Sequence, residues 1–119
     1  MGLPTLNGAG QVKMATLEEC TVLVSRLHST VEKLGLAVKN SQNTGVFYTQ
    51  IRRILEELIG KLKAQFGMVA DQAAAVNLAS SRGGADPVKL RGLREGVAQL
   101  RQALEIAERK VKEQHTVTE

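Results

Sequence analysis

Residues 17–38 read LEECTVLVSRLHSTVEKLGLAV, and one apolar stripe runs through them without a break. Its members recur at alternating steps of three and four residues: Leu17, Cys20, Val24, Leu27, Val31, Leu34 and Val38. This spacing keeps one face of an α-helix apolar in a coiled-coil-like seam. The seam must be buried, either against other helices of the same chain or against a partner protein.

A second seam of the same kind lies near the end of the chain. It consists of Leu90, Leu93, Val97, Leu100, Leu104, Ala107 and Val111. Asp86 is a favoured N-cap residue and Pro87 suits the first helical position, so we predict a helix over about residues 86–114. Gly92 and Gly96 lie inside it. They either let a neighbouring backbone approach closely or are tolerated at a cost of about 1 kcal/mol each.

A wider apolar stripe lies between the two seams. It includes Phe47, Ile51, Ile54, Leu58, Leu62, Phe66, Val69, Ala73 and Val76. We predict one helix over about residues 44–80, in preference to two helices broken near Gly67, where glycine costs about 1 kcal/mol relative to alanine. Thr16 and Glu19 form a capping-box pattern, which predicts that the first helix covers about residues 16–39.

Together these patterns predict an all-α fold, an elongated antiparallel three-helix bundle with coiled-coil-like seams. The turns between the expected helices are short and polar, which places consecutive helices antiparallel. The length of 119 residues fits one domain, which we assign to residues 14–115. Residues 1–13 are rich in glycine and poor in apolar groups, so we expect a disordered N-terminal tail, and we expect residues 116–119 to fray.

We expect a soluble intracellular protein, with the cytoplasm favoured over the nucleus. Its hydrophobic content of 43% and charged content of 24% are ordinary for a globular protein. No apolar run approaches the roughly 18 residues that a membrane span needs, and the N-terminus lacks a secretory signal pattern. The single cysteine allows no internal disulfide, which fits a reducing compartment.

Residue types that carry chemistry are too scattered to predict a site. Cys20 lies on the first seam, where we expect a buried thiol rather than a reactive one. His28 and Glu32 share a helix face, but zinc requires three or four ligands. No phosphate-binding glycine loop is present. We therefore predict no catalytic, cofactor-binding or metal-binding residue and no small-molecule substrate, and we do not expect an enzyme.

The preferred function is a non-catalytic helical subunit or adaptor that works by helix-mediated protein–protein association, as a homodimer or within a larger complex. Apolar residues on and beside the stripes are the candidate partner-binding residues: Leu23, Leu27, Leu55, Ile59 and Ile106. Together they make a self-contained monomer the less favoured state, because extended apolar surface usually marks an interaction site.

The alternative is a nucleic-acid-associated helical module. The chain carries a net charge of +4, and a candidate basic face lies around the last helix: Arg82, Lys89, Arg91, Arg94 and Arg101. Such a face can neutralise phosphates and give salt-sensitive affinity. Acidic residues interrupt it, however, and no aromatic residue accompanies it for base stacking. We therefore rank nucleic acid behind a protein partner.

Overall fold

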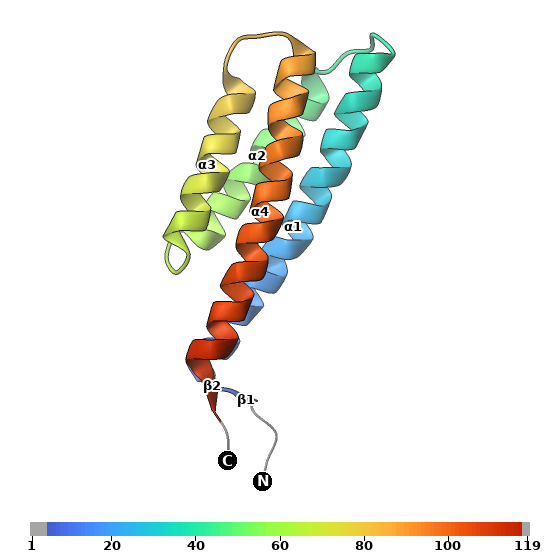
Figure 1. The fold of residues 1–119 in the computed structure, drawn as a ribbon. Coiled ribbons are helices and arrows are strands. Elements are labelled where there is room, and N and C mark those ends of the chain that lie inside the picture. Colours follow the sequence, from blue (N-terminus) through green and yellow to red (C-terminus); the bar gives the residue numbers. More distant parts are fainter. Residues whose placement is uncertain (1–4, 118–119) are drawn as a thin grey trace.

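Residues 5–117, which the computed structural model describes, form four helices and two short strands. The helices are α1 (Gly8–Lys39), α2 (Gly45–Leu62), α3 (Gly67–Ser81) and α4 (Asp86–His115). The strands β1 (Thr5–Leu6) and β2 (Thr116–Val117) pair antiparallel. Each helix packs against the next one along the chain, and α4 packs back against α1. The result is an up-down-up-down bundle (Figure 1).

The predicted helical class is confirmed, but the predicted three-helix bundle is wrong. The expected middle helix over residues 44–80 is two helices in the structure, α2 and α3, joined by a tight turn over residues 63–66. Gly60 and Gly67 flank this turn, and each lowers helix propensity by about 1 kcal/mol relative to alanine. The alternative with a break near Gly67 is the arrangement that the structure has.

Burial explains why the chain folds back here. The second half of the predicted helix carries Val69, Ala70, Ala73 and Val76, and all four are buried between neighbouring helices. Burying a valine side chain contributes about 1.5–3 kcal/mol. The turn costs little in return, because the Phe66 backbone N–H still donates to the Leu62 carbonyl at 2.8 Å. The free energy gained by burying these residues in the core therefore outweighs the preference of the continuous apolar stripe for one long helix.

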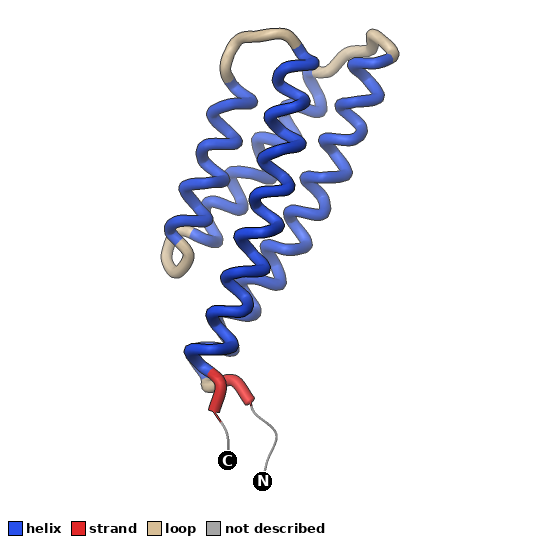
Figure 2. Tube along the Cα trace, in the orientation of Figure 1, coloured by secondary structure: helices blue, strands red, loops and turns tan. Residues whose placement is uncertain are grey.

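The two predicted seams pack inside the bundle. Every seam residue of α1 and α4 is buried except Val38, which is half-buried. The two helices lie side by side along their length, and α2 and α3 complete the core from one side (Figure 2). The seams are therefore covered by helices of the same chain.

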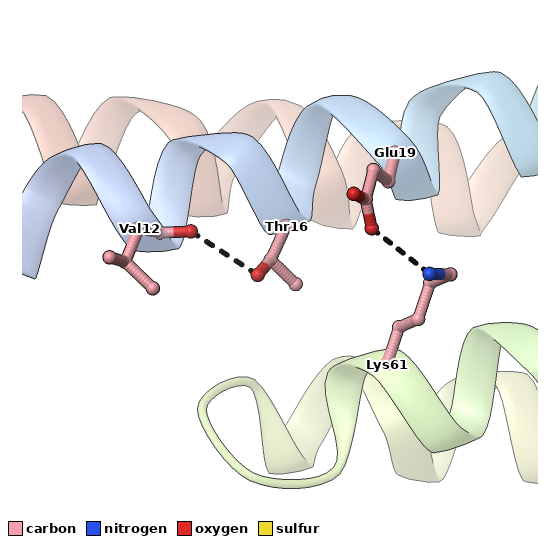
Figure 3. A network of polar contacts seen from close by, with 4 residues as sticks. All are labelled: Val12, Thr16, Glu19 and Lys61. Carbon is pink, nitrogen blue, oxygen red and sulfur yellow. Dashed lines mark hydrogen bonds and ion pairs between the residues drawn. The ribbon is translucent and has the colours of Figure 1, made fainter.

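Helix α1 begins at Gly8 rather than at Thr16, and the predicted capping box is wrong. Asn7 is the N-cap, and its side-chain oxygen accepts a hydrogen bond from the Gly10 N–H at 2.8 Å. Thr16 lies within the helix, where its hydroxyl donates to the Val12 carbonyl at 3.2 Å. Glu19 instead pairs with Lys61 of α2 at 3.0 Å (Figure 3). Asn7 stands in a glycine-rich segment, in which the residue pattern does not indicate the start of a helix.

The two ends of the described chain contact each other. The Asn7 N–H donates to the His115 carbonyl at 2.8 Å, and the Lys13 ammonium lies 3.1 Å from the His115 ring nitrogen Nε2. β1 and β2 pair next to these contacts. Residues 1–4 of the predicted tail, and residues 118–119 of the predicted frayed end, lie outside the described residues.

Helix α4 begins at Asp86 with Pro87 in its first turn, close to the predicted boundary. The N-cap position belongs to Ala85 and not to Asp86, so the predicted cap is wrong. The Asp86 carboxylate instead accepts a hydrogen bond from the Tyr48 hydroxyl at 2.7 Å. Burial and this carboxylate raise the pKa of Tyr48 above its ordinary value. The bond joins the first turns of α2 and α4.

Helices α1 and α4 extend beyond the α2–α3 turn at the end where the termini lie (Figure 1). The Lys61–Glu19 pair marks the level at which α2 ends against α1, and α1 continues from Glu19 back to Gly8. At 1.5 Å per residue this overhang is roughly 16 Å long. Along the overhang, no described helix covers the side of the α1–α4 pair that α2 and α3 cover elsewhere.

Gly96 allows α3 and α4 to approach closely. A Cβ atom placed on Gly96 would lie 2.6 Å from Val76 Cγ2, whereas one placed on Gly92 would meet no atom within 4 Å. We predict that Gly96→Ala lowers the free energy of unfolding by about 1–3 kcal/mol through overpacking. Gly92→Ala should raise it by up to about 1 kcal/mol, because alanine favours the helix. Urea unfolding followed by circular dichroism measures both changes.

A double-mutant cycle provides the control for this prediction. Val76→Ala removes the methyl groups that face Gly96, so it should cost less stability in the Gly96→Ala background than in the wild type. Equal effects of the two glycine substitutions, or no coupling between positions 76 and 96, would contradict the close packing.

Candidate functional site

The five predicted partner-binding residues do not share one surface. Leu23, Leu27 and Leu55 lie in the core and are at most 4% exposed. Ile59 is half-buried on α2. Ile106 on α4 is 49% exposed. Side chains inside the bundle stabilise the fold and are not accessible to a partner while the bundle is intact. Ile106 is therefore the member of the set that marks an accessible surface.

Ile106 lies in a groove below the α2–α3 turn, with a volume of about 530 Å³. The turn, the start of α3 and the second half of α4 form its walls. Met68 at the start of α3 is 83% exposed, so apolar side chains on both walls reach solvent. The apolar lining includes Phe66, Met68, Ala103, Ile106, Ala107 and Val111. We call this feature the step groove.

The step groove follows from the unequal lengths of the helices. α2 and α3 contain 18 and 15 residues, whereas α1 and α4 contain 32 and 30. The face of α4 that carries Ala103 and Ala107 packs beside α3 at its upper end and continues below the point where α3 begins. Below that point Ala107 is still buried, but Ile106 beside it is 49% exposed, because no described helix covers it on the side that α3 covers higher in the bundle.

The polar lining of the step groove is neutral or basic. It consists of Gln65, Gln72, Gln99, Gln102, Gln114, Lys13 and Lys110. Glutamine amides can both donate and accept hydrogen bonds, and lysine contributes positive charge. Among the described residues, no aspartate or glutamate lines the groove, and Asp71 and Glu113 lie outside its lining. The site is therefore apolar along its length with a positive, hydrogen-bonding border.

Chemistry beyond binding has little support in this groove. Its described lining contains no serine, cysteine, histidine or carboxylate that could act as a nucleophile or general base. Within residues 5–117, no group of three or more His, Cys, Asp or Glu side chains could hold a metal ion. No helix in the described part of the chain is both long and apolar enough to cross a membrane.

Cys20 is buried and free, as predicted from its place on the first seam. Burial raises the pKa of its thiol to about 11, although nearby Lys61 acts in the opposite direction. A thiol with a raised pKa and no exposed surface is a poor nucleophile, because the thiolate is the reactive form. Cys20 therefore serves the core as a small apolar side chain.

We predict that the raised pKa of Cys20 makes the free energy of unfolding decrease as the pH rises from about 9 to about 11. The thiol of the unfolded chain loses its proton near pH 9, while the folded protein holds its proton until about pH 11. The unfolded state therefore binds fewer protons in this window, which favours unfolding. Urea midpoints of the wild type should drop more steeply here than those of Cys20→Ala, which removes the thiol but keeps Tyr48.

The five residues of the predicted basic face do not form one surface. The Lys89 ammonium lies over the Tyr48 ring, 5.1 Å from its centroid. The Arg94 guanidinium pairs with Glu32 of α1 at 3.3 Å. Successive helical residues are rotated by roughly 100°, so Lys89 lies on another side of α4 from Arg94 and Arg101.

The remaining basic residues do not restore a uniform positive face. Arg101 lines a groove between α1 and α4 together with Glu105 and Glu108. Arg82 and Arg91 are exposed near the start of α4. Charges of both signs therefore alternate along this side of the bundle, which weakens attraction to a phosphate backbone.

The nucleic-acid alternative predicts salt-sensitive binding that Arg94→Glu with Arg101→Glu abolishes. Because of the mixed charge, we expect the wild type to bind short duplex DNA or single-stranded RNA with a Kd no lower than about 10⁻⁴ M at physiological salt. Fluorescence anisotropy at two salt concentrations measures this affinity. A micromolar Kd that weakens with salt and is lost in the double variant would favour the alternative instead.

Ile106 is the residue of the predicted set that lines the step groove, and the sequence did not single out the other lining residues. Ala103, Ile106 and Lys110 recur at steps of three and four residues, which marks a second face of α4 beside the seam. That periodicity could have indicated an additional contact surface. The other wall could not be found in this way, because Phe66 and Met68 reach the groove only through the turn between α2 and α3.

No family model, curated protein or solved structure matches this chain. Any functional statement about it therefore rests on its own residues and their geometry.

Proposed function

We propose that this protein is a non-catalytic helical subunit or adaptor that works by helix-mediated protein association, with the step groove as its binding site. The observation that carries the proposal is the apolar face of α4 below the α2–α3 turn. There Ile106 is 49% exposed, and Met68 across the groove is 83% exposed. Exposed apolar side chains in a groove with a polar border are typical of a protein-binding site.

A helix is the partner element that fits this groove. An amphipathic helix can place apolar side chains in a hydrophobic groove at steps of three, four and seven residues. A helix lying along α4 would continue the position that α3 occupies beside α4 higher in the bundle. A fully exposed side chain of this size gains about 1.5–3 kcal/mol on burial, so covering the exposed 49% of Ile106 and 83% of Met68 would contribute roughly 0.7–1.5 and 1.2–2.5 kcal/mol.

The chemical character of the groove supports a binding role without catalysis. The described lining offers apolar contacts, amides and lysine ammonium groups, but no pair of groups suited to nucleophilic or acid–base catalysis. We further propose an intracellular location, in the cytoplasm before the nucleus. The single cysteine of the chain is buried and unpaired, which suits a reducing compartment.

Two matched double variants test the proposed function. The groove variant combines Met68→Gln with Ile106→Gln. The control variant combines Leu36→Gln with Leu78→Gln at positions that are 60% and 54% exposed and do not line the groove. Exposed substitutions of this kind usually change stability by no more than about 0.5 kcal/mol, so both variants should fold. Circular dichroism and thermal unfolding verify this.

We predict that the tagged wild-type protein retains a stoichiometric protein partner after nuclease treatment and in high salt. The groove variant should bind this partner at least about thirtyfold more weakly, as expected for loss of central apolar contacts. The control variant should bind like the wild type. Affinity capture followed by titration of the purified partner measures the change. A partner that binds all three proteins equally would contradict the placement of the site.

A further inference from the structure

We infer that the step groove binds an acidic amphipathic helix, whose apolar stripe is flanked by aspartate or glutamate. This inference rests on the proposed function, because it names the chemistry of the helix that occupies the same groove. Two independent features of the groove lead to it: the charges of its lining and the direction in which it runs along α4.

The charges of the lining favour an acidic partner. Lys13 and Lys110 are its charged members, its other polar members are glutamines, and no described carboxylate lines it. The whole chain is also basic, with a net charge of +4. Opposite charges at the border of an interface speed association and select the partner, whereas like charges placed together disfavour the complex. A basic helix would bring like charges next to both lysines.

The positions of the two lysines indicate where the acidic residues of the partner lie. Lys110 is close to the end of α4, and the Lys13 ammonium is 3.1 Å from the His115 ring nitrogen. Both therefore lie toward the end of the bundle that holds the termini. Phe66 and Met68 line the groove at its other end, beside the α2–α3 turn. The bound helix should carry its carboxylates at the end near the termini and its apolar anchor residues near the α2–α3 turn.

The length of the groove also suits a helix. Its lining on α4 extends from Gln99 to Gln114. At 1.5 Å per residue this corresponds to roughly 22 Å, or about four helical turns. The upper part of this stretch lies beside α3, whose Val69 and Gln72 also line the groove. The overhang below the α2–α3 turn is roughly 16 Å long, so a partner helix of about 11 residues can follow it from the turn toward the termini. Its apolar stripe would face Ala103, Ile106 and Ala107.

A second copy of this chain fits the groove less well. In a symmetric dimer each copy contributes the same patch, so the two step grooves would face each other. With the two-fold axis parallel to α4, this arrangement brings Lys13 and Lys110 of one copy toward the same lysines of the other, and with the axis perpendicular to α4 it places them beside the apolar end of the other groove. No described carboxylate lines the groove to neutralise them. Charge thus favours a different chain over self-association.

A displayed peptide library tests the inference on the full-length protein. The peptides are about 15 residues long, with leucine fixed on one helical face and the flanking positions randomised. We expect selection on the wild type to enrich aspartate and glutamate at the flanks, mainly at one end of the peptide. Synthetic versions of the enriched peptides, with a fluorescent label, then give dissociation constants by anisotropy.

Charge reversal is the decisive comparison. The selected acidic peptide should bind Lys13→Glu with Lys110→Glu about tenfold more weakly than the wild type, as expected for two charge pairs at the border of the groove. The difference should shrink in high salt, which screens such pairs. The matched control, Lys33→Glu with Lys39→Glu, changes the net charge equally on exposed positions of α1 outside the groove. It should retain nearly wild-type affinity. A peptide with lysine in place of its acids should show the reverse preference.

The outcomes separate this inference from the proposed function. Peptides that lose binding to the groove variant but carry neutral or basic flanks would overturn the acidic preference and leave a helix-binding groove in place. Failure to select any peptide, or peptides that bind the groove variant normally, would overturn both proposals. Sedimentation equilibrium adds a further test. A dimer that the groove variant dissociates would assign the groove to a second copy and overturn the inference.

Discussion

The antiparallel packing of α1 against α4 is the constraint on which the rest of this structure depends. The two longest helices bury their seams against each other and against α2 and α3, and they hold both termini at one end. Burial of each large apolar side chain contributes about 1.5–3 kcal/mol, so the two seams together outweigh any single turn or ion pair. The shorter helices α2 and α3 pack onto the α1–α4 pair, and this pair sets the direction and length of the bundle.

Residues 44–80 fold back on themselves to form α2 and α3. These two short helices complete the core, but they cover only the upper part of the α1–α4 pair. Val76 packs so closely against Gly96 that a Cβ atom at position 96 would force Val76 to shift, and this contact places α3 on the upper part of α4. Because α2 and α3 are short, they leave Ile106 on the lower part of α4 half-exposed, although the seam residues Ala107 and Val111 near it remain buried. The step groove is thus a consequence of helix lengths, and no special loop or strained backbone is needed to form it.

Charge is distributed differently on the two sides of α4. Beside α1, Arg94 pairs with Glu32, and Arg101 lies near Glu105 and Glu108, so opposite charges balance. In the step groove the lysines have no described carboxylate beside them in the lining. Exposed ion pairs contribute little to stability, but an unbalanced border around an apolar groove can select a partner by charge. The net charge of the chain is therefore less informative than the local balance around each groove.

The sequence by itself determined the helical class, both seams, the burial of Cys20 and the start of α4 near Pro87. These features depend on residue spacing and local backbone preferences, which periodicity reports directly. Only the tertiary structure decided that residues 44–80 form two helices, that Asn7 and not Thr16 caps α1, and that Leu23, Leu27 and Leu55 are core residues. It also separated Lys89 from Arg94 and brought Met68 opposite Ile106. Such outcomes depend on which helices become neighbours, and an apolar stripe has the same spacing whichever helix covers it.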